Sequence, residues 1–495
     1  MVVMNTTTSC PQCNEHAIKI ESLLAENIYL KSELAQLKRY IFGQRRERFI
    51  PAGDDQIPLG LDIEVKDNTP AKTERIEYIR KRRNGKITPH GRREIPSGLP
   101  RNEIIIEPEE RSSASKCIGK EVTEELEYRP GKLYVNRYIR LKYKEEDTGN
   151  IIIGSLPNRP IEKGIPGPGL LSHILVSKYV DHLPIYRQLK QFKREEIEIS
   201  QSTMNDWIKY SCQLLEPLYQ QLKVEVLSSD YLMIDETPIR VLDSKIKGRS
   251  HTGYFWVYYS PLKKMVFFDY RTNRSREGPN EILKDYHGYI QTDAYSGYDE
   301  VSKKEGVTSV GCFAHARRYF EQSKDTDRER SIWMLEKIGQ LYEIERTLRD
   351  QNASFEKRHA KRQESSLPVL SEIRDWLDKD ILEVLPKSII GKAIGYMHNN
   401  WQRLNRYLDH GKLEIDNNLV ENAIRPVALG RKNYLFKGSH KGAQRSAILY
   451  SLLNTVNLQN KNPWKYLRDT LIRIPDHSIK KLNQLLPSNY QEPDE

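Results

Sequence analysis

Residues 231–238 read YLMIDETP, four apolar side chains followed at once by two acids. A short apolar run that ends in polar residues is typical of a buried strand. The pattern therefore predicts a strand over residues 231–234 that delivers Asp235 at its end.

Further apolar, β-rich runs surround this one. They lie at residues 254–259, 265–270, 289–291 and 307–313, with a helical stretch at 278–286. The fourth run leads into Asp293 in YIQTDAYSGY (residues 289–298). Three strands, a helix and further strands predict an α/β layer of ribonuclease H type.

The stretch at 413–439, LEIDNNLVENAIRPVALGRKNYLFKGS, predicts a helix that Asp416 caps. At helical spacing its apolar residues fall on one face: Val420, Ala423, Ile424 and Val427. The polar ones fall on the other: Asn417, Asn418, Glu421 and Arg425. A solvated surface helix is the simple alternative.

No acid occurs from residue 422 to residue 468, although the segment is rich in Lys and Arg. Candidates to meet DNA phosphates here are Arg425, Arg431, Lys432 and Lys437. Glu421, just before this segment, would join Asp235 and Asp293 as a third carboxylate. Such a set suits Mg²⁺ or Mn²⁺, because these hard cations bind oxygen ligands and leave positions for phosphate and water.

The whole chain has 495 residues and a net charge of +11, with a pI near 9.1 and a mean hydropathy of -0.70. This length implies several domains, and the basic balance favours a polyanionic partner. With no long apolar run and no signal-peptide pattern, we expect a cytoplasmic protein that associates with the nucleoid through DNA and not with membranes. The five cysteines are scattered, which argues against a disulfide framework.

Near the amino end, apolar residues recur at alternating steps of three and four between residues 20 and 41. They place branched residues opposite leucines, with Asn27 in the seam. This heptad pattern favours a parallel two-stranded coiled coil and hence a homodimer or higher oligomer. A single amphipathic helix packed on its own domain is the alternative.

Residues 80–101, RKRRNGKITPHGRREIPSGLPR, hold eight basic residues and one acid. Arg80, Lys81, Arg82 and Arg83 could lie along phosphates in an extended arm, and a disordered charged linker is the equal alternative.

Three helical patterns follow at 170–180, 184–195 and 202–215. They suggest a helix-turn-helix unit with Trp207 and Ile208 turned inward, although small helical bundles look similar. The third helix would expose its DNA-facing side chains: Ser202, Thr203, Asn205 and Lys209.

Asp293 and Glu421 are 128 positions apart, more than a strand and a helix require. The segment at 328–407 has helical periodicity, so we expect a helical insertion that contacts DNA or braces a dimer.

Four motifs together resemble the transposases of the bacterial insertion-sequence family numbered sixty-six, often called TnpC. They are IDETP, QTDAYSGY, CFAHARR with Cys312 and His315, and IDNNLVENAIRPVALGRKNYLF. The resemblance implies that Asp235, Asp293 and Glu421 form a DDE triad. It also matches KYVDHLPIYRQ and STMNDW to a helix-turn-helix region and the heptad seam to a leucine-zipper-like region.

The expected domains follow from these patterns and the resemblance. They are a leucine-zipper-like coiled coil (15–50), a linker and basic arm (51–105), a degenerate zinc-binding-like region (106–163), the helix-turn-helix region (164–225), the first part of the core (226–321), the helical insertion (322–410), the second part of the core with the catalytic Glu (411–455) and a C-terminal helical tail (456–495).

Members of this family commonly carry two Cys-x-x-Cys pairs where this chain keeps only Cys117, so zinc is doubtful there. The isolated pair Cys10 and Cys13 has no nearby partners. Cys312, His315 and Asn418 are expected to shape the site, with a structural histidine as the alternative for His315.

The resemblance implies a DNA transposase that cuts the terminal inverted repeats of its own element and joins them to target DNA. Two alternatives remain: a structure-specific nuclease on the same fold, and a catalytically silent DNA-binding regulator. The sequence leaves open whether helper proteins of the same element are required.

Overall fold

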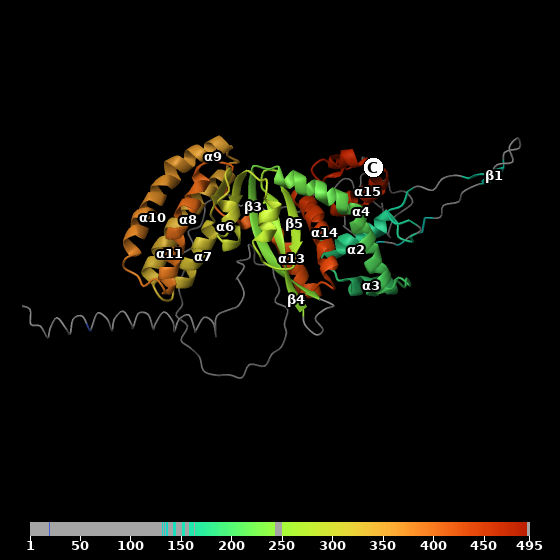
Figure 1. Cartoon of the computed structure of the whole chain (residues 1–495), viewed down its shortest axis with the longest axis horizontal. Coiled ribbons are helices and arrows are strands. Elements are labelled where there is room, and N and C mark those ends of the chain that lie inside the picture. Colours follow the sequence, from blue (N-terminus) through green and yellow to red (C-terminus); the bar gives the residue numbers. More distant parts are fainter. Residues whose placement is uncertain are drawn as a thin grey trace, which may run out of the picture. The chain divides into compact units, whose positions relative to one another are not determined.

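The computed structural model describes residues 158–162, 164–242 and 250–492, with short stretches before them (Figure 1). Those stretches include the strands β1 (Lys142–Lys144) and β2 (Ile151–Ile153), which pair antiparallel. They belong to a unit of residues 48–156, separate from the compact unit of residues 157–495. The expected coiled coil, basic arm and region around Cys117 lie outside the described residues.

A five-stranded mixed sheet forms the centre of the larger unit, in the order β5-β4-β3-β6-β7. β3 pairs antiparallel with β4, and β4 with β5, whereas β3, β6 and β7 run parallel. The strands are β3 (Tyr231–Leu242), β4 (Ser250–Ser260), β5 (Met265–Arg271), β6 (Gly288–Gln291) and β7 (Val307–Val310). The mixed α/β character is as predicted.

β3 continues eight residues beyond its predicted end, so Asp235 lies inside the strand and not at its terminus. The prediction was wrong because the acids of DETP interrupt the apolar run while alternation resumes after them. Ile239 and Val241 are buried on one face, and the backbone stays paired with β4 as far as Leu242.

Short helices join the later strands. They are α5 (Glu277–Ile282), η1 (Ser296–Tyr298) and α6 (Asp299–Ser302). The predicted helix over 278–286 is thus shorter. The run predicted as a strand over 307–313 also ends early, because Phe313 already begins a helix.

Three helices precede the sheet, as the sequence predicts: α2 (Pro168–Tyr179), α3 (Ile185–Arg194) and α4 (Gln201–Leu227). Ser200 caps α4 by accepting a hydrogen bond from the Thr203 amide at 3.0 Å. Trp207 and Ile208 are buried, which confirms the predicted inner face.

The segment between β7 and residue 410 is helical, as predicted. Its elements are α7 (Phe313–Ser323), α8 (Arg328–Asp350), α9 (Phe355–Lys361), η2 (Arg362–Ser366), α10 (Leu367–Asp380), α11 (Ile389–Asn399), α12 (Trp401–Asn405) and η3 (Arg406–Leu408). These helices gather beyond the β7 edge of the sheet (Figure 1).

The carboxyl-terminal part returns to the sheet through α13 (Asn418–Tyr434), α14 (His440–Leu458), α15 (Pro463–Arg473), η4 (Ile474–Asp476) and η5 (Ile479–Leu485). α14 lies along β5 at the opposite edge (Figure 1). There the hydroxyls of Ser451 and Thr455 accept hydrogen bonds from the β5 amides of Phe268 and Val266, at 2.8 and 3.1 Å. The sheet edge is thereby covered, as exposed strand edges require. Among the described residues, no helix is long and apolar enough to cross a membrane.

Candidate active site and nucleic-acid interface

Asp235 is a largely buried carboxylate in the middle sheet strand. Its Oδ1 accepts a hydrogen bond from the Glu236 amide at 2.8 Å. Burial, followed by the negative charges of Glu236, Asp293 and Glu421, raises the pKa of Asp235 well above its usual value. Asp293 and Glu421, predicted from separate motifs, therefore lie near enough to Asp235 in the folded chain to act on its carboxylate.

Asp293 lies two residues beyond β6, in the turn that leads to η1. Its Oδ1 accepts a hydrogen bond from the Tyr295 amide at 2.9 Å. The Tyr396 hydroxyl of α11 donates to the Asp293 carbonyl at 3.1 Å. The parallel register of β3 with β6 sets Met233 opposite Gln291. Asp235 and Asp293 each follow two residues later, so the register brings this turn beside Asp235.

Glu421 stands in the first turn of α13, and the residue before that helix fixes its position. Asn417 is fully buried. Its amide N–H donates to Cys312 Sγ at 3.2 Å, and its Nδ2 donates to the Ile234 carbonyl at 3.2 Å. The start of α13 is thus attached to β3 one residue before Asp235, and also to the start of α7.

This placement corrects the predicted polar face of the helix. Asn417 points into the core, whereas Asn418 is exposed and donates through Nδ2 to Asp416 Oδ2 at 2.7 Å. Helical spacing placed both on one face because it treated Asn417 as part of the helix, but α13 begins at Asn418. The apolar face is confirmed: Val420, Ala423, Ile424 and Val427 are buried. The predicted cap at Asp416 was wrong by one position: Asn417 occupies the N-cap without a side-chain cap hydrogen bond, and Asp416, just before it, accepts from the Asn418 amide at 3.0 Å.

Glu236 is a second buried acid, which the sequence prediction missed. Its side chain is 3% exposed and pairs with Arg274, while the Tyr298 hydroxyl donates to Oε2 at 2.6 Å. Arg274 in turn lies 3.8 Å over the Tyr295 ring. The available signal was a second acid directly after Asp235 in IDETP, to which no role was assigned.

Cys312 and His315 open α7 beside this cluster. Cys312 is fully buried and accepts the Asn417 bond, and burial raises the pKa of its thiol to about 12. Its observed contact is therefore a structural one that holds α13. His315 is half-buried.

Carboxylates suit a divalent cation chemically, because Mg²⁺ and Mn²⁺ prefer oxygen ligands. Burial and the negative charges of neighbouring acids raise the pKa of Asp235, and a bound cation would offset the repulsion by those acids. In the described ranges, no three His, Cys, Asp or Glu side chains already stand grouped as ligands of one ion. Carboxylate oxygens are the ligand type that such an ion prefers, so only the type of side chain, and not a preformed cluster, speaks for a metal here.

The predicted DNA-contacting residues divide by exposure. Arg425 and Lys432 are exposed, and Arg431 is half-buried and donates to the Pro238 carbonyl. Lys437 is only 5% exposed, so it does not stand on the surface as predicted. It is buried because its backbone pairs with the far end of β3, through Arg240 and Leu242. Arg80 to Arg83 lie outside the described residues.

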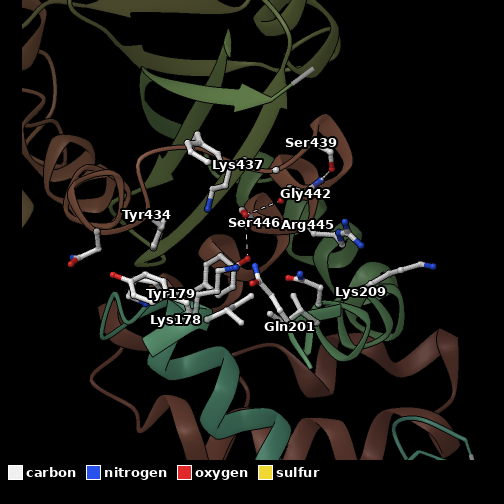
Figure 2. A pocket seen from close by; sticks show the side chains of 18 of the residues that line it. Lys178, Tyr179, Gln201, Lys209, Tyr434, Lys437, Ser439, Gly442, Arg445 and Ser446 are labelled. Carbon is white, nitrogen blue, oxygen red and sulfur yellow. Dashed lines mark hydrogen bonds between the residues drawn. The ribbon is translucent and has the colours of Figure 1, made fainter. Parts of the chain in front are cut away.

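On α4, Ser202 and Asn205 are exposed, and Thr203 and Lys209 are half-buried. Asn205 and Lys209 share with Lys437 the lining of a cavity of ≈ 750 Å³ between α2, α4 and the connection from α13 to α14 (Figure 2). Residues predicted as two separate DNA-contacting groups thus meet at one hollow.

Comparison with known proteins adds an independent line of evidence. Residues 163–445 match the family profile described as "Transposase IS66 family", and residues 29–104 match "Transposase C of IS166 homeodomain". The chain is also similar to proteins of Sinorhizobium fredii. The uncharacterized protein y4jD is 31% identical over 95% of this chain and 96% of its own. The uncharacterized protein y4hP is 30% identical over 93% of this chain and 88% of its own.

Proposed function

The chain belongs to the IS66 transposase family, and from this we propose that it binds the terminal inverted repeats of its own insertion sequence and catalyses metal-dependent cleavage and strand transfer. The observation that carries the proposal is that the charges of Asp293 and Glu421, from two distant segments of the chain, act on the buried Asp235. DNA is the expected partner of a DNA-binding transposase, and its site of action would be bacterial DNA in the cytoplasm.

The proposed fold of the catalytic core is ribonuclease H-like. The order of elements supports this assignment. Three antiparallel strands come first, then a helix, and then two strands that run parallel to the first. We further assign α2 to α4 as a helix-turn-helix unit, supported by the exposed polar side chains at the start of α4.

In the proposed mechanism, Asp235, Asp293 and Glu421 hold Mg²⁺ or Mn²⁺. When bound, the ions would neutralise charge on the transferring phosphate and activate a water or a 3′-hydroxyl. The chain's own contribution is positioning. Asn417 fixes the start of α13 and hence Glu421, and the exposed Arg425 and Lys432 attract the DNA backbone.

Glu236 has a supporting part in this scheme. Arg274 and Tyr298 hold its carboxylate by ion pairing and hydrogen bonding. Its negative charge beside Asp235 would strengthen the attraction of the site for a cation.

The experiment that tests the function compares two duplexes in nicking and strand-joining assays with Mg²⁺. One carries the ends of the element and the other carries scrambled ends. A transposase cuts and joins the first and leaves the second intact. Equal cutting of both would favour a structure-specific nuclease, and tight binding without any cutting would favour a silent regulator.

A further inference from the structure

The cavity that Lys437 lines is formed by segments far apart in the chain (Figure 2). Lys178 and Tyr179 come from the end of α2, Lys209 from α4, and Arg445 and Ser446 from α14. Its ≈ 750 Å³ lies within the range of pockets that hold small ligands.

One carboxylate, that of Asp206, also lines the cavity, but three of its basic residues have no acid paired with them in the part of the chain that the structure describes. Lys437 Nζ is buried and has no hydrogen-bond partner. In the described ranges, no carboxylate forms an ion pair with Lys178, Lys437 or Arg445. Burial, and then the charge of Lys178, lowers the pKa of Lys437 well below its usual value. Burying unpaired charge is costly, so such a cluster points to an anionic ligand.

Aromatic rings surround the Lys437 amine. Its Nζ lies 4.5 Å from the ring centre of Tyr434 and 5.3 Å from those of Tyr179 and Tyr450. These cation–π contacts make burial of the amine tolerable, but they satisfy none of its three N–H donors. A hydrogen-bond acceptor on a bound ligand could satisfy these N–H donors.

The outer part of the cavity is lined by exposed aromatic residues, in contrast to the basic residues farther in. Tyr186 and Phe436 line it and are exposed, although both are large aromatic residues. Leu435, before Phe436, has φ 44, a left-handed conformation that costs energy for a leucine. This backbone ends α13 and leaves Leu435 and Phe436 exposed. Exposed aromatic rings beside basic residues are typical of sites on which unpaired bases stack.

We propose that this cavity binds one unpaired nucleotide of a DNA strand, with its phosphate between Lys178, Lys437 and Arg445 and its base against Tyr186 and Phe436. The assignment of DNA as the source of the nucleotide rests on the proposed function. The basic residues and the exposed aromatic rings are observed features of the cavity, and they do not depend on the proposed function.

α13 sets the distance from this nucleotide to the carboxylates. The helix carries Glu421 in its first turn and Tyr434, which lines the cavity, at its end. With a rise of 1.5 Å per residue, the two are about 20 Å apart, which is roughly six base pairs of B-DNA. The bound nucleotide is therefore not the one that is cut, and it would fix the register of the strand at the carboxylates.

The test measures binding of the full-length protein, without divalent cations, to a blunt duplex and to the same duplex with an unpaired tail. The wild type should favour the tailed duplex. Arg445→Gln and Phe436→Ala should each weaken tailed binding roughly tenfold and blunt binding much less, because they remove a charged hydrogen-bond donor and a stacking ring. Lys441→Gln, at an exposed lysine four residues before Arg445 that does not line the cavity, is the matched control and should weaken both duplexes equally.

Lys437→Met separates a binding role from a structural one. Removing an unpaired buried charge should raise the melting temperature while the preference for the tail is lost. A lower melting temperature with an unchanged tail preference would overturn the proposal.

Equal tail preference in wild type, Arg445→Gln and Phe436→Ala would also overturn it. A deoxynucleoside monophosphate as competitor distinguishes the sources of the nucleotide. If it binds the cavity but the tailed DNA does not displace it, the assignment to a strand is wrong. The binding assay needs no cleavage, so it is independent of the proposed function. If the protein prefers the tailed duplex but never cuts DNA, the cavity proposal stands and only the proposed catalytic function is contradicted.

Discussion

Asn417 is the residue on which the position of Glu421 depends. Its backbone and side chain contact Cys312 and Ile234, so a single buried amide links two helices and the central strand. Sequence periodicity assigned it to an exposed face, because the helix was expected to begin directly after Asp416, whereas α13 begins at Asn418. Its tertiary partners, a carbonyl and a thiol over 100 residues away, leave no local pattern.

Asn417→Ala should lower the free energy of unfolding by about 1–3 kcal/mol, because the Ile234 carbonyl loses its side-chain donor in a buried place. DNA cutting should fall more than DNA binding, since Glu421 is displaced while the basic residues remain. Urea unfolding and nicking assays measure the two effects. Asn418→Ala, at an exposed neighbour, is the control. Equal effects of the two changes would contradict the role of Asn417.

Lys178 gives a pH dependence whose sign can be worked out. Burial lowers its pKa from 10.5 to about 8, with smaller effects from Cys212, which raises the pKa, and from Arg445, which lowers it. Between these pH values the unfolded chain binds a proton that the folded chain does not, so stability rises with pH. The melting temperature of the wild type should therefore rise relative to Lys178→Met from pH 8 to 10.5. A constant difference across that window would contradict the depressed pKa.

At the scale of elements, the helical insertion braces the segment that leads into α13. Arg362 is fully buried, pairs with Glu345 at 2.7 Å, and donates to the carbonyls of Tyr407, His410 and Leu413. Arg358 binds Glu414 at 3.0 Å. The sequence predicted a helical insertion but left its role open, because the contacts with the segment before α13 join residues 45 to 56 positions apart.

Glu345→Gln should destabilise the protein by about 3–5 kcal/mol, because it leaves the Arg362 charge buried without its carboxylate. The measurement is denaturant unfolding. Glu336→Gln, exposed on the same helix, should change stability little. If both variants unfold at the same denaturant concentration, the buried pair does not hold the insertion in place.

These contacts also change the choice of control residues at the site. Glu414 and Asp416 are carboxylates near Glu421, and from their sequence positions before or at the helix start we expect their amides to do less harm than Glu421→Gln. Glu414 instead pairs with Arg358, and Asp416 accepts a hydrogen bond from the Tyr342 hydroxyl at 2.8 Å. Amide variants of either would disturb the brace, so an exposed helix carboxylate elsewhere is the better control.

For the whole molecule, the sequence predicted what depends on local pattern. Strand runs, the inner face of α4 and the helical insertion follow from apolar periodicity. Three features depend on tertiary contacts instead: the length of β3, set by pairing with β4; the burial of Lys437, set by pairing with β3; and the Glu236 pair with Arg274. Periodicity carries no information on such partners.

Self-association is predicted from the heptad seam, which lies outside the described residues. Leu30→Pro should break the coiled coil, because proline within a helix costs about 3 kcal/mol. Sedimentation of the full-length protein should show a smaller assembly than the wild type. The same assembly in both would mean that another surface holds the subunits together.

The central claim, that Glu421 completes a catalytic site with Asp235 and Asp293, is tested most directly by Glu421→Gln. The change keeps the size of the side chain and removes its charge, so folding and DNA binding should persist while metal-dependent nicking of the element's ends is lost. Glu329→Gln, which removes an exposed carboxylate from the first turn of α8, is the matched control and should cut normally. If Glu421→Gln nicks DNA at the rate of the wild type and of Glu329→Gln, the third carboxylate of the site is not Glu421.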